Sequence, residues 1–109
     1  KEILNELPGG YIGENEKPEE AAQRELLEET GYKGNAKLVT IAYDCAYSTM
    51  KRYCVVVTHC KKIATQKLDK TEFAEVVLMP LDEFCQLLRS GKMTDVEVGY
   101  LCLDYLKLL

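Results

Sequence analysis

The sequence of 109 residues lacks any apolar run near the roughly 18 residues that a membrane-spanning helix needs. It also lacks a basic excess, because 14 Lys and Arg stand against 18 Asp and Glu, for a formal charge of −4. Nucleic-acid phosphates are bound through basic surfaces. These absences predict a protein that binds neither membrane nor nucleic acid, and that binds a small anion only through a cation.

Histidine and paired cysteines are also scarce. One histidine and five cysteines without C-x-x-C spacing argue against a structural zinc site. An odd number of cysteines favours free thiols in a reducing compartment, so we expect a cytoplasmic protein. Four cysteines lie in apolar stretches typical of strands or helices and are expected to be small buried hydrophobes: Cys54, Cys60, Cys85 and Cys102.

What remains is a chain of globular composition. Hydrophobic residues make up 47% and charged residues 29%, and there is no repeat or low-complexity linker. Because a chain of this length buries roughly 65% of its unfolded surface, we expect one domain over residues 1–109. The chain begins at Lys1 inside a strand-like stretch, so we expect N-terminal strands to be missing.

Turn residues and hydrophobic periodicity divide the chain into seven expected elements. Pro18 favours the first turn of a helix and Gly31 its end. Thr94 and Glu97 form a capping box that predicts the start of the last helix. The expected strands are residues 2–7, 36–43, 52–60 and 74–79, and the expected helices are 18–30, 81–89 and about 94–107. This order predicts an α/β or α+β fold with a mixed sheet.

Three glutamates share one face of the first expected helix. At about 100° per residue, Glu28 and Glu29 lie at about −60° and about +40° from Glu25. Like charges at this spacing repel by about 0.2–0.5 kcal/mol per pair. Two interpretations remain open: a solvated acidic face, or a site for Mg²⁺ or Mn²⁺, which prefer carboxylate and carbonyl oxygens.

The residues around this face follow a longer pattern. Gly10 precedes Glu16 by five intervening residues, and seven more lead to the run Arg24-Glu25-Leu26-Leu27-Glu28-Glu29-Thr30-Gly31-Tyr32. This resembles the Nudix box, G-x5-E-x7-R-E-U-x-E-E-x-G-U with U apolar, and all seven fixed positions match. The resemblance implies an α/β/α sandwich with a mixed sheet. It also implies a hydrolase that uses divalent metal to cleave a nucleoside diphosphate linked to another group.

The resemblance implies roles for particular residues. Mg²⁺ or Mn²⁺ would be held by carboxylates and by a carbonyl before the box, from Gly9, Glu16, Glu25, Glu28 and Glu29. Arg24 and Glu28 would take part in catalysis, Arg24 by pairing with a box glutamate and orienting it. A surface ion pair is the alternative for Arg24.

Segments outside the box resemble the ADP-ribose pyrophosphatases and other nucleoside-diphosphate-sugar hydrolases. Residues 6–10 look like their E-L-P-[AG]-G strand, and residues 71–76, 80–84 and 90–95 are similar to their later motifs. The implied reaction gives a nucleoside monophosphate and a sugar phosphate, with ADP-ribose as the first candidate, in a homodimer. Two alternatives remain: a nucleoside triphosphate or dinucleoside polyphosphate hydrolase, and a non-catalytic nucleotide-binding module.

Candidates outside the box are fewer. The sugar-nucleotide enzymes often take their general base from the loop before the last strand, which implies Glu72 here, against the alternative of an ordinary loop carboxylate. Tyr47 and Arg52 lie near the turn between two expected strands and are candidate substrate contacts, or parts of a plain turn. His59 is expected to have a packing or surface role rather than a catalytic one.

Overall fold

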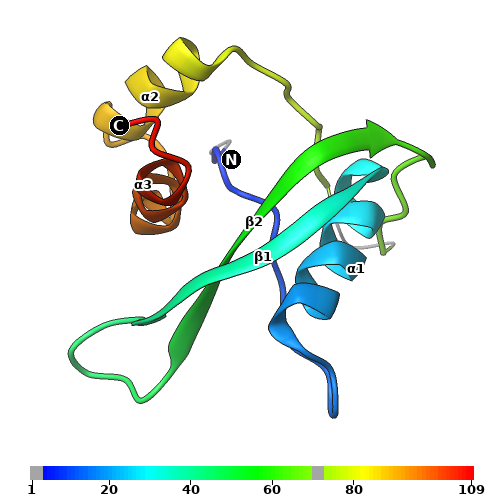
Figure 1. The fold of residues 1–109 in the computed structure, drawn as a ribbon, viewed down its shortest axis with the longest axis horizontal. Helices are drawn as coiled ribbons and strands as arrows, with labels where there is room; N and C mark the ends of the chain where they lie inside the picture. The colour runs from blue at the N-terminus through cyan, green and yellow to red at the C-terminus, as the bar shows by residue number, and fades with distance from the viewer. Residues whose placement is uncertain (1–3, 70–72) are drawn as a thin grey trace. The chain divides into compact units, whose positions relative to one another are not determined.

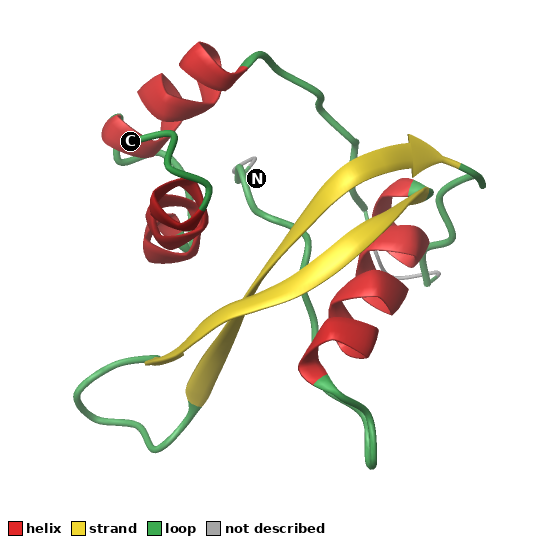
Figure 2. Ribbon diagram, in the orientation of Figure 1, coloured by secondary structure: helices red, strands yellow, loops and turns green. Residues whose placement is uncertain are grey.

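The computed structural model describes residues 4–69 and 73–109. These residues form three helices and one two-stranded antiparallel sheet, so the predicted α+β class is confirmed (Figures 1 and 2). The chain divides into two compact units, Pro8–Ala74 and a second unit in which Glu75–Leu109 joins the N-terminal residues as far as Leu7. Within the described ranges, none of the helices combines the length and apolar character that crossing a bilayer requires.

The first unit begins with helix α1, Pro18–Thr30. Pro18 is its first residue, and the Lys17 backbone N–H donates to Glu20 Oε1 at 3.0 Å just before it. The helix ends at Gly31, whose φ of 79° lies in the left-handed region that glycine adopts without a Cβ clash. Both predicted ends of this helix are therefore confirmed.

A long antiparallel pair of strands follows, β1 over Tyr32–Tyr43 and β2 over Lys51–Lys62. Both strands extend beyond their predicted bounds, and the pairing shifts register at residues 33–35 and at residues 38–40. Helix α1 packs along this pair, as Figure 2 shows. Its Ala21 is buried, as are Cys54 and Val56 of β2, so the core of this unit lies between helix and sheet.

The second unit contains α2, Leu81–Arg89, and α3, Val96–Tyr105, which contact each other. Leu88 and Leu103 are its buried apolar residues. Gly99 allows the helices to approach closely, because a Cβ there would lie 2.6 Å from Leu88 Cδ2. The N-terminal segment joins this unit through a parallel bridge between Asn5 and Met93.

Two predicted strands are wrong in the described part of the chain. Residues 74–79 form no strand, and residues 4–7 contribute only the bridge at Asn5, so the described sheet is antiparallel rather than mixed. Val77 and Leu78 are 63% and 71% exposed. Their apolar, β-branched pattern favours an extended chain, but a strand also needs a partner in register, which local sequence does not specify.

The predicted capping box at Thr94 is also wrong. Helix α3 follows Asp95, whose φ is 55°, and no side chain caps it. The Thr94 hydroxyl and backbone N–H both donate to the Asn5 carbonyl oxygen, at 3.4 Å and 3.0 Å. Asp95 rather than Thr94 occupies the position just before the helix, so the Thr94 hydroxyl is not at the capping position.

All five cysteines are free thiols, as predicted. Cys54 is buried, and Cys85 and Cys102 are half-buried. Cys60 was expected inside but is exposed, because it lies where β2 departs from regular pairing with β1.

Candidate active site

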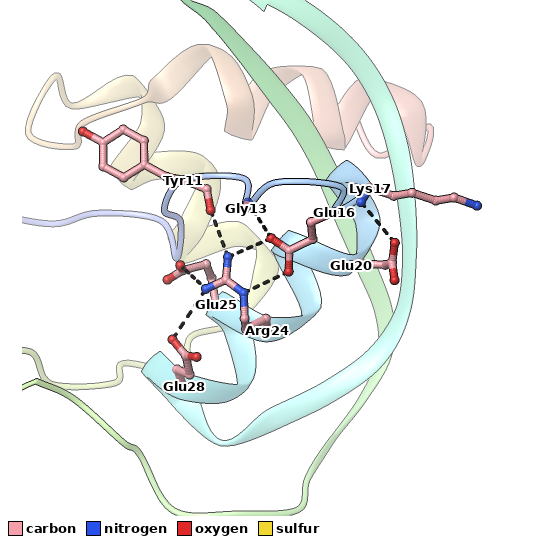
Figure 3. Close-up of polar contacts among 8 residues, drawn as sticks. All are labelled: Tyr11, Gly13, Glu16, Lys17, Glu20, Arg24, Glu25 and Glu28. Carbon is pink, nitrogen blue, oxygen red and sulfur yellow. Dashed lines mark hydrogen bonds and ion pairs between the residues drawn. The ribbon is translucent and has the colours of Figure 1, made fainter.

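The guanidinium of Arg24 on α1 is the centre of a cluster of carboxylates (Figure 3). Its Nε donates to Glu16 Oε2 at 2.9 Å, and its Nη1 donates to Glu25 Oε1 at 2.8 Å. Its Nη2 donates to Glu16 Oε1 at 3.0 Å and to the Tyr11 carbonyl oxygen at 2.9 Å. Glu28 Oε2 lies 3.8 Å from Nη1. We call Arg24, Glu16, Glu25 and Glu28 the Arg24 cluster.

Local sequence explains how these side chains meet. Arg24 and Glu28 are one helical turn apart, so they lie on the same side of α1. Glu16 belongs to the preceding loop, where its backbone N–H donates to the Gly13 carbonyl at 3.1 Å. The Gly13 N–H donates to Glu16 Oε1 at 2.8 Å. This turn directs the Glu16 carboxylate back to Arg24, which fastens the loop to the helix.

The same contacts keep the cluster ionised. Hydrogen bonds from Arg24, and then from the Gly13 backbone, lower the pKa of Glu16 to about 2. The bonds to Glu16 and Glu25 raise the pKa of Arg24 above its usual value. Glu16 is therefore a carboxylate, and Arg24 a cation, throughout the neutral range.

The two glycines before the loop lie against the other side of the glutamate face. The Gly9 N–H donates to Glu29 Oε1 at 2.8 Å. A Cβ on Gly10 would collide with the carboxylate of Glu25, so a larger residue here would push that carboxylate aside. The backbone at residues 9–10 thus contacts two glutamates that are one helical turn apart.

The donor atoms here are of the type that a hard divalent cation binds. Three carboxylates around one guanidinium leave a surplus of negative charge, and a fourth, Glu29, accepts from the glycine backbone beside them. In residues 4–69 and 73–109, no three His, Cys, Asp or Glu side chains are grouped to hold a metal. The reason is that Glu16, Glu25 and Glu28 turn their oxygens toward Arg24 and Glu29 turns one toward Gly9. The residue types fit a metal, and binding one requires carboxylates to turn from Arg24 to the ion.

A family comparison accounts for this combination of helix, glutamates and glycines. The NUDIX domain model matches residues 1–99 of the chain. The chain belongs to the NUDIX family. The Arg24 cluster lies within residues 10–32, the segment whose sequence follows the Nudix box pattern.

Several curated proteins are similar to this Nudix chain. The ADP-ribose pyrophosphatase of Bacillus subtilis (strain 168) is 32% identical over 94% of the chain and 57% of its own length. The ADP-sugar pyrophosphatase of Mus musculus is 36% identical over 72% of the chain and 39% of its own. A CMP-5'-(N-acetyl-N-hydroxy-3-aminopropyl)phosphonate hydrolase of Streptomyces rubellomurinus (strain ATCC 31215) is 34% identical over 80% of the chain and 43% of its own. The chain thus spans about half the length of these relatives or less.

Three of the predicted residues after the Nudix box, Tyr47, Arg52 and His59, lie on β2 or in the connection that precedes it. Tyr47 is fully exposed in the connection between β1 and β2, which projects away from α1 in Figure 1. Arg52 donates through Nε to Asp44 Oδ1 at 2.8 Å, at the same end of the strand pair. His59 is exposed, in agreement with a surface role. Glu72 lies outside the described residues. The substrate and base roles of these residues stay predictions.

Helix α1, which we also call the Nudix helix, is connected to the chain after β2 by contacts that the sequence did not predict. The Lys67 N–H donates to the Glu28 carbonyl at 2.7 Å, and the Ile63 N–H donates to the Gly31 carbonyl at 2.9 Å. The carbonyls in the last turn of a helix have no N–H partner within the helix. The sequence therefore indicates that donors from another segment must reach them, although it does not say which. The segment that leads toward Glu72 is thereby fastened to the end of α1.

Proposed function

We propose that this Nudix domain is a metal-dependent hydrolase of nucleoside diphosphates linked to another group. The preferred substrate is ADP-ribose or another nucleoside-diphosphate sugar, and the products are a nucleoside monophosphate and a sugar phosphate. The observation that carries the proposal is the Arg24 cluster, with the backbone at residues 9–10 against the same glutamates. The relatives support it, because ADP-ribose and ADP-sugar pyrophosphatases are among them.

Charge explains the need for metal in this proposal. A pyrophosphate is strongly anionic, and the only guanidinium of the cluster already binds three carboxylates. Bound Mg²⁺ or Mn²⁺ would supply polarisation of the phosphate, activation of water and stabilisation of the leaving oxygen. We assign the ion to Glu25, Glu28 and Glu29 with the Gly9 carbonyl. Glu16, which the sequence grouped with the ligands, is engaged by Arg24 and Gly13 in the structure.

The remaining residues orient groups and move a proton. Arg24 holds Glu25 through Nη1 while it holds the loop through Glu16 and Tyr11, so one side chain aligns both sides of the site. Glu28 is the fourth member of this cluster and a candidate acid or base. Glu72 is proposed to accept the proton of the attacking water. Tyr47 and Arg52 are proposed to contact the nucleotide.

A substrate panel tests this function. Full-length protein is incubated with ADP-ribose, other nucleoside-diphosphate sugars, nucleoside triphosphates and dinucleoside polyphosphates, with Mg²⁺, with Mn²⁺ or with EDTA. We expect AMP and ribose 5-phosphate from ADP-ribose only when metal is present. Faster turnover of a triphosphate or dinucleoside polyphosphate would transfer the assignment to that class. Binding without turnover of any substrate would contradict an enzyme.

A further inference from the structure

The strand pair beneath the Nudix helix is interrupted at one glycine. Lys33 pairs with Lys61 and Asn35 with Thr58, so Gly34 alone on β1 lies opposite two residues, His59 and Cys60, on β2. This is a β-bulge, in which one strand carries an extra residue. His59 takes a φ of 55° there. A Cβ on Gly34 would collide with the Thr58 carbonyl oxygen, so the bulge requires glycine at this place.

A side chain of α1 binds Gly34, the β1 residue opposite the bulge. Gln23 Nε2 donates to the Gly34 carbonyl oxygen, and the Gly34 N–H points to Gln23 Oε1 at 3.5 Å. Gly34 is half-buried, and backbone N–H and C=O groups shielded from water need hydrogen-bond partners. The side-chain amide of Gln23 carries an NH₂ donor for the Gly34 C=O and a carbonyl acceptor for the Gly34 N–H. These two contacts between Gln23 and Gly34 join α1 to β1.

Gln23 lies on the opposite face of α1 from the carboxylates. At about 100° per residue, Glu25 is about 200° and Glu28 about 140° around the helix from Gln23. The amide therefore anchors the inner face, and the glutamates project from the outer face. An anchor of this kind resists rotation of the helix about its own axis.

We propose that Gln23 is a positioning residue for the Nudix carboxylates, acting through its link to the bulge at Gly34. The proposal rests on the proposed function. A rotation of about 10° moves an atom about 6 Å from the helix axis by about 1 Å. Misplacement by 1 Å in an active site lowers rates by about a hundredfold in unfavourable cases. Apolar packing of α1 alone leaves such a small rotation weakly opposed, because its contacts are not directional.

Two substitutions at one position test this role. Gln23→Met keeps the length of the side chain and its apolar stem but removes both polar groups. Gln23→Glu keeps an acceptor and replaces the donor, so a carboxylate faces the Gly34 carbonyl. For both variants we expect kcat on ADP-ribose with Mg²⁺ to fall about 10- to 100-fold, while KM changes less than about threefold. Gln86→Met, at an exposed glutamine of α2, is the matched control and is expected to leave kcat unchanged.

A second measurement does not depend on turnover. The Arg24 Nε–H signal in a ¹⁵N–¹H NMR spectrum of metal-free protein reports the Arg24–Glu16 hydrogen bond. We expect it to shift in Gln23→Met and to stay in place in Gln86→Met. Wild-type kcat in folded Gln23→Met would overturn the positioning role. If the wild type hydrolyses no substrate, the proposed function fails. The NMR signal then decides the positioning role by itself: a shifted Arg24 signal in Gln23→Met supports that role, and an unchanged signal overturns it.

Discussion

At the scale of single residues, Arg24 carries several connections that a lysine could not make together. Its planar guanidinium donates to Glu16 through two nitrogens and to Glu25 and the Tyr11 carbonyl as well. These bonds place one metal-ligand candidate, Glu25, in a defined orientation. The same bonds mean that Arg24 and a metal ion compete for the oxygens of Glu25 and Glu28.

We predict that Glu25→Gln abolishes turnover and leaves the fold intact. The amide keeps an oxygen that can accept from Arg24 but loses the charge that attracts a divalent cation. Mn²⁺ binding by calorimetry and thermal unfolding are the measurements, with Glu20→Gln on the same helix as the control. Wild-type activity of Glu25→Gln in Mg²⁺ would contradict the metal assignment.

We predict that Glu72→Gln lowers kcat by about 10²–10⁴-fold, the usual contribution of acid–base catalysis. Metal affinity should change little, because we place the metal on the Nudix helix. Steady-state kinetics on the best substrate of the panel make the measurement, and Glu75→Gln is the neighbouring control. Should Glu72→Gln keep normal kcat, the base role passes to Glu28.

At the scale of elements, the loop before α1 is attached to the helix through an ion pair whose strength depends on pH. The pKa of Glu16 falls from 4.5 to about 2 on folding, so its contribution to stability is present above about pH 4.5. That contribution is lost as the pH falls toward 2, when the carboxylate becomes protonated. Both side chains reach the surface, so the effect is a modest one.

The corresponding prediction concerns Glu16→Gln in metal-free protein. We expect the wild type to have the higher Tm above pH 4.5, and the difference to shrink as the pH falls toward 2. Thermal unfolding in EDTA across this range measures it, because subtracting the two curves removes the titration of other groups. Parallel curves would show that the ion pair does not link loop and helix.

The contact between α2 and α3 gives a prediction on packing. Gly99→Ala places a methyl group 2.6 Å from Leu88 Cδ2 and 3.3 Å from Phe84 Cζ. Leu88 is buried and has little room to move. The clash outweighs the helix propensity of Ala, so we expect a loss of about 1–2 kcal/mol in the free energy of unfolding. Urea titration measures it, with Gln86→Ala at an exposed position of α2 as the control.

At the scale of the whole molecule, the sheet within residues 4–69 and 73–109 consists of β1 and β2, each with an outer edge. Such a pair is marginal alone, and exposed edges tend to pair with further strands. We therefore predict that the full-length protein is a homodimer. Light scattering at micromolar concentration tests this, and a monomer mass across a dilution series would contradict it.

Local sequence determined the bounds of helix α1 and its acidic face. Pro18 and Gly31 set its ends through their own backbone preferences, and the spacing of Arg24, Glu25 and Glu28 set one acidic face. Helix 81–89 was predicted for the same reason, with Pro80 before it. These features depend on neighbours within one or two turns, which is why they could be read without the fold.

Only the tertiary structure decided which distant groups meet. Gln23 gave no signal by itself, because its partner Gly34 becomes available only where β2 bulges. Thr94 has the sequence of a helix cap, yet its hydroxyl binds Asn5. Residues 74–79 have strand composition and no strand partner. In the first two cases the deciding contact joins different segments of the chain, and in the third a partner in register is needed; local sequence has no information about whether such a partner is in reach.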